Sequence, residues 1–303
     1  MKKSFLTLFI TAALLLPASV FAASASISVS VPSQAVAAGD TVLLPVMLNV
    51  PGPAGINAFS AHIAISGPAH IVNASTGGSV FTFWPEGPSV ASDTVLFLGG
   101  TPGSVYGSPL RAVTVVVSAV SAGRVTIRVT HATAYAADGK GTPQLLKDSE
   151  TSFVVGQKAA SPRNELSDVL TKDTAPPDPF TIELGRDPSL YRDAYFISFA
   201  TSDEGSGVVR YEVSENGSPA IATTSPYVLS DQSLSDSVTV HAVDAAGNVR
   251  TETLRFKPLS MLGCVASALP ALGCGGLSGL VLVGVALLVA VLGYLYLRKR
   301  HHE

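Results

Sequence analysis

The sequence is poor in charged residues, cysteine and tryptophan. Of its 303 residues only 14% are charged and the net charge is −3, whereas about 25% charged residues is usual for a soluble domain. So few charges exclude disorder driven by charge repulsion. The slight acidic excess excludes a general attraction to nucleic acid, which needs a basic field, and no nucleic-acid partner is expected. The 27 glycines and 20 prolines are aperiodic, which excludes collagen.

The N-terminal segment has the pattern of an export signal. Lys2 and Lys3 precede an apolar run over residues 5–16, and small residues follow up to Ala22. This order of a basic, an apolar and a small-residue region is typical of a signal peptide. We predict that residues 1–22 are cleaved, with an uncleaved membrane anchor as the alternative.

A long uncharged segment lies near the other end of the chain. Residues 277–297 contain no charge, and as a helix they would span about 31 Å, the thickness of a bilayer core. Basic residues follow at 298–300, and such residues stay on the cytoplasmic side. We therefore expect an exported, single-pass membrane protein with residues 23–276 outside and a cytoplasmic tail at 298–303.

The only two cysteines, Cys264 and Cys274, lie just before this span in a Gly/Pro-rich juxtamembrane segment, residues 258–276. In an oxidising compartment they either form a local disulfide or remain two free thiols. No histidine, aspartate or glutamate lies between them, so a metal site is not expected there.

Residues 23–156 are predicted to form a β-sandwich of the jelly-roll kind. Apolar and polar residues alternate in short runs separated by Gly, Pro and Asp turns, the pattern of half-buried strands. Pro45 inside one run indicates an edge strand or a bulge. The expected strands are Ser26–Val31, Thr41–Leu48, Phe59–Ile65, Thr94–Leu98, Ala112–Val120, Arg124–Val129 and Ser152–Val155.

A linker at residues 157–176, with one or two helical turns over Asn164–Thr171, leads to a second β-unit at residues 177–257. About 80 residues with five clear strand candidates suit a seven-stranded immunoglobulin-like (Ig-like) sandwich. The strand candidates are Phe180–Leu184, Ala194–Thr201, Val208–Glu212, Ser237–Val243 and Val249–Phe256. The fold class is therefore all-β, two sandwiches followed by one transmembrane helix.

Three stretches of the first unit, in order, resemble a cohesin domain, the dockerin-binding module of cellulosome scaffolds. Residues 39–46 (GDTVLLPV) look like the family's opening strand, 55–63 (GINAFSAHI) like its next strand, and 134–141 (AYAADGKG) like its late Ala-Asp-Gly turn. The resemblance covers about residues 26–155. It implies a jelly-roll sandwich that docks a dockerin-like protein across one sheet, although carbohydrate-binding modules share this fold class.

The second unit resembles bacterial Ig-like modules through residues 206–213 (SGVVRYEV) and 240–248 (VHAVDAAGN). The resemblance implies a spacer.

The candidate partner contacts follow from the implied docking sheet and from the single tryptophan. Trp84 is interpreted either as an exposed platform for a sugar or protein, or as an aromatic residue that covers the end of the sandwich. The candidate contact residues are Phe59, Ala61, Ile63, Trp84, Val95 and Phe97.

Calcium is a candidate cofactor in the second unit. Asp203, Asp244 and Asn248 place oxygen ligands in turns, and calcium prefers such oxygens. Aspartate and asparagine are equally ordinary turn formers, which is the alternative.

No catalytic motif accompanies these features, so no enzyme is expected. We expect non-catalytic docking of a dockerin-like or other surface protein. The alternatives are a carbohydrate-binding module that holds polysaccharide, and a structural envelope or adhesion protein.

Overall fold

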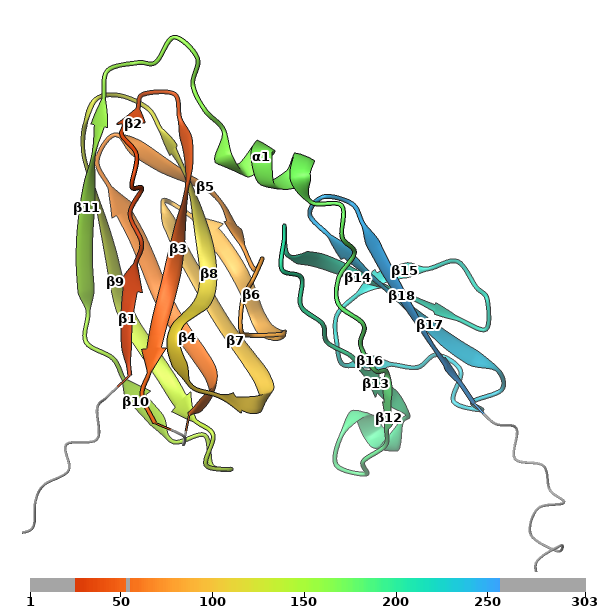
Figure 1. The fold of residues 1–303 in the computed structure, drawn as a ribbon. Coiled ribbons are helices and arrows are strands. Elements are labelled where there is room, and N and C mark those ends of the chain that lie inside the picture. The colour runs from red at the N-terminus through yellow and green to blue at the C-terminus, as the bar shows by residue number, and fades with distance from the viewer. Residues whose placement is uncertain (1–24, 53–54, 257–303) are drawn as a thin grey trace, which may run out of the picture.

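The computed structural model of the chain describes residues 25–52 and 55–256, which form two β-units joined by a short helix (Figure 1). The all-β class is confirmed for these residues. In the first unit, a sheet in the order β1-β3-β8-β5 faces a sheet in the order β2-β11-β9-β4-β7-β6, with β10 paired to β9. The strands are β1 (Ser26–Val29), β2 (Val36–Ala37), β3 (Thr41–Val50), β4 (Ile56–Ser66), β5 (Ala69–Ser75), β6 (Phe83–Ala91), β7 (Thr94–Val105), β8 (Gly107–Ala119), β9 (Gly123–Ala136), β10 (Pro143–Leu145) and β11 (Ser149–Gly156).

The core of the first unit lies between these two sheets. Because side chains alternate along a strand, every second residue of a half-buried strand faces the opposite sheet. On β3 these residues are Val42, Leu44, Val46 and Leu48, none more than 1% exposed. The alternation in the sequence therefore identified the inward faces of the strands.

Pro45 lies on β3 between β1 and β8, so the expectation of an edge strand is wrong there. The alternative, a bulge, is what the structure has, because the β3–β8 register shifts between Val46 and Met47. Proline lacks an N–H group but keeps its carbonyl, and the Pro45 carbonyl accepts a hydrogen bond from the Ser30 amide at 2.8 Å.

Four strands of the first unit were not expected from the sequence: β2, β5, β6 and β10. Pro85, Gly87 and Pro88 interrupt β6 and hide its period. The strand forms because it is at the edge of its sheet, where a missing N–H group costs no ladder bond. Its pairing with β7 shifts register twice.

The linker contains helix α1 (Glu165–Lys172), which lies where one or two helical turns were expected. The side chain of Asn164 caps it, accepting a hydrogen bond from the Ser167 amide at 3.0 Å.

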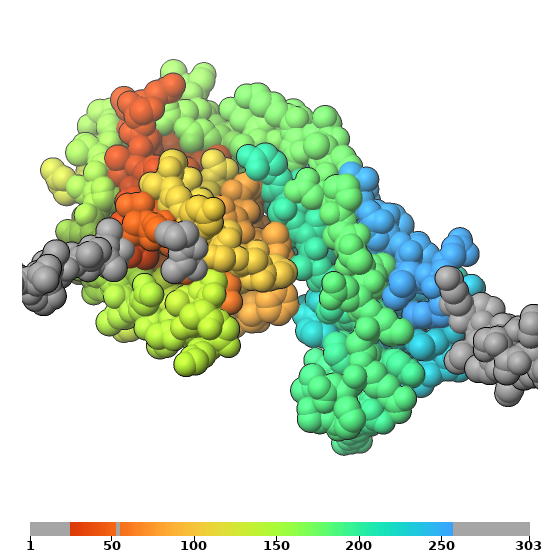
Figure 2. Space-filling model, turned by 60° about the horizontal axis from the view of Figure 1, so that its bottom comes forward, coloured from red at the N-terminus to blue at the C-terminus, as the bar shows by residue number. Residues whose placement is uncertain are grey.

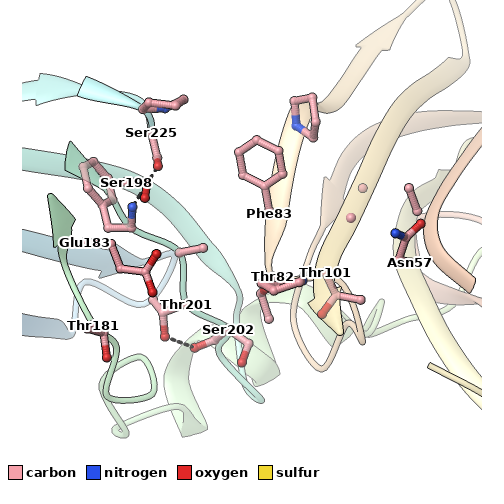
Figure 3. A pocket seen from close by; sticks show the side chains of 18 of the residues that line it. Asn57, Thr82, Phe83, Thr101, Thr181, Glu183, Ser198, Thr201, Ser202 and Ser225 are labelled. Atoms are coloured by element: carbon pink, nitrogen blue, oxygen red, sulfur yellow. Dashed lines mark hydrogen bonds between the residues drawn. The ribbon is translucent and has the colours of Figure 1, made fainter. Parts of the chain in front are cut away.

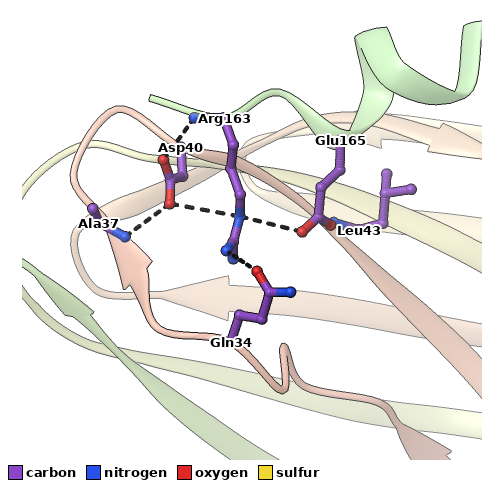
Figure 4. A network of polar contacts seen from close by, with 6 residues as sticks. All are labelled: Gln34, Ala37, Asp40, Leu43, Arg163 and Glu165. Carbon is purple, nitrogen blue, oxygen red and sulfur yellow. Dashed lines mark hydrogen bonds and ion pairs between the residues drawn. The ribbon is translucent and has the colours of Figure 1, made fainter. Parts of the chain in front are cut away.

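A polar network fixes the start of this linker to the first unit (Figure 4). The Asp40 carboxylate accepts hydrogen bonds from the amides of Ala37 and Arg163, both at 2.9 Å. The Arg163 Nε lies 3.7 Å from Asp40 Oδ2 and 3.3 Å from Glu165 Oε1. Glu165 in turn accepts a hydrogen bond from the Leu43 amide at 2.8 Å. The Gly-Asp turn before β3 is thus the attachment point of the linker.

The second unit has seven strands in two sheets, ordered β12-β13-β16 and β15-β14-β17-β18. Its core includes Ile197, Val213 and Val240. The strand number agrees with the Ig-like interpretation, which stays a prediction. The strands are β12 (Glu183–Gly185), β13 (Phe196–Ser198), β14 (Val208–Glu215), β15 (Ile221–Thr223), β16 (Tyr227–Val228), β17 (Ser237–Asp244) and β18 (Val249–Arg255).

The expected signal peptide at 1–22, the span at 277–297 and both Cys264 and Cys274 lie outside the described residues. Within the part of the chain that is described, no helix is long and apolar enough to cross a membrane.

Candidate functional site

Five of the six candidate contact residues point into the core, so their assignment as partner contacts is wrong. Phe59, Ala61 and Ile63 on β4 are 0% exposed, and Val95 and Phe97 on β7 are 0% and 2% exposed. Both strands form where the sequence predicted them, but the side chains chosen are those that face the core. A partner would contact their neighbours along the chain.

Trp84, the sixth candidate, covers one side of the sandwich. Its ring lies edge-on to Phe81 and Phe97, with both centroid separations 6.2 Å. A Cβ atom at Gly99 would lie 2.7 Å from the indole ring, so this glycine makes room for it. Trp84 is half-buried, which favours the covering role over the exposed platform.

The outward side chains of β4 and β7, together with His131 from β9, form a face that we call the outer face. Its members are Ser60, His62, Ala64, Thr94, Leu96 and His131. His62 and His131 lie at its centre with ring centroids 4.8 Å apart, and His62 is also paired with Leu96, which is 36% exposed. His131 reaches this position through a left-handed backbone conformation at φ 54°.

None of these six members of the outer face is an acidic, lysine or arginine residue. The nearest charges adjoin this face: Arg128 on β9 is paired with Ala64, and Glu150 on β11 is paired with Arg128. Arg128 Nε and Glu150 Oε2 lie 2.7 Å apart, so the two charges offset each other, and both side chains are exposed. An exposed pair of this kind contributes little to stability. The outer face therefore offers shape, hydroxyl and imidazole groups to a partner rather than charge.

A second cluster of functional groups is acidic and lies where the linker meets the second unit. Oxygen atoms of Asp173, Asp203 and Asp244 lie within 4.8 Å of one another, and Asp203 and Asp244 are buried. The sequence indicated Asp203 and Asp244 but missed Asp173, which comes from the end of the linker. The side-chain nitrogen of Asn248, rather than its oxygen, bonds to Asp244 Oδ2 at 2.9 Å, so Asn248 holds the cluster together and is not placed as a ligand.

Burial is the main cause of a raised pKa at Asp203; the charges of Asp173 and Asp244 raise the pKa further, and the Gly207 amide opposes it. Burial also acts to raise the pKa of Asp173, but hydrogen bonds from Ser206 and Ala175 outweigh it and lower that pKa. Three carboxylates at this spacing match the oxygen ligands and 2.3–2.6 Å bonds of calcium. Calcium binding here stays a prediction.

The variant Asp203→Asn is expected to raise the melting temperature at pH 7 by a few degrees. A carboxyl whose pKa is higher in the folded than in the unfolded protein favours folding when protonated, and this stability is lost as pH rises through the folded pKa. The amide can still accept the Gly207 hydrogen bond, 2.7 Å long in the structure. The difference from the unsubstituted chain should shrink as the pH is lowered, which thermal melts at several pH values measure.

The same variant tests calcium. If the ion binds, calcium should raise the melting temperature of the unsubstituted chain over that in chelator, and Asp203→Asn should abolish the rise. Equal melting in calcium and chelator would contradict the calcium prediction.

The two units contact each other through loops rich in glycine. The Gly78 amide donates to the Asp203 carbonyl at 2.8 Å, and the Ser75 hydroxyl donates to the Ser206 carbonyl at 2.8 Å. A Cβ atom at Gly77 would lie 2.2 Å from the Gly205 carbonyl oxygen, so the backbones touch. Beyond this contact the units diverge, and Figure 2 shows the notch between them.

No protein-family model matches the chain, and no curated protein matches it. Solved cohesin modules are similar to it in structure. A cohesin module of a family 33 glycoside hydrolase from Clostridium perfringens shares 15% identity, with a TM-score of 0.38 over 45% of this chain and 98% of that one. A non-cellulosomal cohesin from Archaeoglobus fulgidus shares 11% identity, with a TM-score of 0.37 over 44% and 92%. A Clostridium thermocellum cohesin, solved with its dockerin, shares 16% identity, with a TM-score of 0.35 over 44% and 94%.

Proposed function

We propose that this chain is an exported, membrane-anchored binding protein whose first unit docks a dockerin-like or other surface protein without catalysis. The export and anchoring part of the proposal is supported by the sequence patterns at residues 1–22 and 277–297. The docking part is supported by the motifs of the first unit and, above all, by the outer face.

The outer face carries the proposal because it combines exposure with little charge. Leu96 and Ala64 can be desolvated at low cost because they are apolar, whereas the imidazoles of His62 and His131 would need hydrogen bonds from the partner. An interface of this kind relies on shape and apolar contact rather than on electrostatic steering. Its affinity should therefore change little with salt concentration.

The second unit is proposed to act as a spacer. It is tied to the first unit by the hydrogen bonds from Gly78 and Ser75 and by the linker network of Asp40 and Arg163. These contacts hold it beside β5 and β6, at one side of the sandwich (Figure 1). The centre of the outer face remains accessible, as His62 is partly and His131 largely exposed.

Leu96→Asp is expected to weaken docking by at least about thirtyfold, because a charge would be buried at the centre of the interface, where truncations commonly cost ~2 kcal/mol or more. The matched control is Val72→Asp. Val72 is also an exposed aliphatic residue on a strand, β5, but it belongs to the other sheet. Binding of the full chain to a panel of purified dockerin modules, measured by biolayer interferometry, provides the test.

Docking that responds equally to the two variants would contradict the assignment of the outer face. Failure of every dockerin in the panel to bind the unsubstituted chain would remove the dockerin-like partner from the proposal.

A further inference from the structure

A cavity of about 850 Å³ lies between the two units (Figure 3). None of its lining residues belongs to the outer face, which it adjoins where Leu98 is paired with Ser60. One wall comes from β6, β7 and the start of β4, and the other from the segment before β12 together with β13 and the turn before β16. Binding sites for small molecules commonly occupy about 300–1,000 Å³ and occur preferentially between domains. The cavity is thus large enough for a ligand longer than a single sugar ring.

Polar side chains face this cavity from both units without partners of their own. Asn57, Thr82 and Thr101 come from the first unit, and Thr181, Glu183 and Ser198 from the second. No hydrogen bond involves any of these six side chains within the described part of the protein. They remain available as donors and acceptors for a ligand rich in hydroxyl groups.

One aromatic ring projects into the same space. Phe83 is half-buried on β6 and extends from the first-unit wall into the space between the units, with Ser198 and Ser225 on the opposite wall (Figure 3). Gly100 lies beneath it, 3.8 Å from the ring at the position a Cβ atom would take. A flat apolar surface beside unpaired hydroxyl groups suits the face of a sugar, which is apolar on its C–H side and polar at its rim.

The charge of the cavity lining further restricts the classes of ligand that can bind. Among the described residues that line the cavity, the only ionisable side chains are acidic, Asp178 and Glu183. A phosphate, sulfate or uronic acid would find no cation to pair with and would be repelled.

An extended peptide is also disfavoured, since strand addition needs backbone N–H groups at a sheet edge. Pro85 and Pro88 remove two such groups from β6, the edge strand at this cavity.

We propose that the cavity between the units binds an uncharged oligosaccharide, with Phe83 stacking on a sugar ring and the six polar side chains bonding its hydroxyl groups. This site is distinct from the proposed docking face. It also differs from the sugar platform that the sequence suggested at Trp84.

The full chain is tested on an array of uncharged gluco-, manno-, galacto- and xylo-oligosaccharides beside sulfated and uronic-acid glycans and an extended peptide. The strongest ligand is then titrated calorimetrically. Phe83→Ala should weaken binding at least tenfold. Thr181→Trp, a substitution at an exposed position that fills the cavity, should do the same without disturbing the core. Leu145→Ala, at a residue 78% exposed on β10, is the control and should bind as the unsubstituted chain does.

Any of three results would overturn the proposal. The first is that the chain binds no uncharged glycan, the second is that it prefers anionic glycans or the peptide, and the third is that Thr181→Trp binds as well as the unsubstituted chain. Dockerin binding serves as the independent readout, because Thr181→Trp should leave it unchanged whichever way the glycan result falls.

Discussion

Phe59→Ala is expected to destabilise the first unit by about 3–5 kcal/mol, the usual cost of removing a fully buried phenyl ring. Phe59 is 0% exposed, and its ring lies 5.7 Å from that of Phe97 and 6.3 Å from that of Phe81, between centroids. Truncation would leave a cavity at the centre of this aromatic group. Ser60→Ala, one residue along on the outer face, should change stability by less than about 0.5 kcal/mol.

Fluorescence makes this test specific to one unit, since Trp84 is the only tryptophan and packs beside Phe97. Urea unfolding followed by tryptophan emission therefore reports the first unit alone. Similar losses of stability for Phe59→Ala and Ser60→Ala would show that the inward and outward faces of β4 are assigned incorrectly.

Gly77→Val is expected to separate the two units while leaving each folded. Even a Cβ atom at this position would come within 2.2 Å of the Gly205 carbonyl oxygen, so the loops cannot remain in contact. The hydrogen bonds from Gly78 to Asp203 and from Ser75 to Ser206 should be lost with the contact. Small-angle X-ray scattering should record an increase of a few ångström in the radius of gyration.

Gly103→Val is the matched control, because no atom lies within 4 Å of the added Cβ position. The midpoint of tryptophan-detected unfolding should be alike for Gly77→Val, Gly103→Val and the unsubstituted chain. A scattering curve unchanged by Gly77→Val would mean that this contact does not hold the units together.

The sequence was sufficient to predict which strands are half-buried, because the alternation along β3 and β4 follows directly from the geometry of a strand. It was not sufficient to predict β6, whose prolines are tolerated only because the strand lies at the edge of its sheet. Edge position is a property of the assembled sheet and leaves no local signal.

The sequence predicted β4 and β7 as strands, but the side chains chosen from them as partner contacts lie in the core. Phe59 and Ile63 were chosen as contacts because they lie on a strand of the implied docking sheet, but as large apolar residues they face the core. Exposure of their neighbours His62 and Leu96 follows from the same alternation and would have identified the outer face. Asp173 had no such signal, because it joins Asp203 and Asp244 only through the path of the linker.

The attachment of the linker also determines how this protein would respond to mechanical force. A pull between the outer face and Phe256 is carried by two parallel routes: the loop contacts of Gly78 and Ser75 with the second unit, and residues 157–176 with helix α1. Once the loop contacts break, the linker alone carries the force, and the eight residues of the helix can lengthen by about 15 Å, from a rise of ~1.5 Å to ~3.4 Å per residue. The linker would therefore extend by that amount before either sandwich had to unfold.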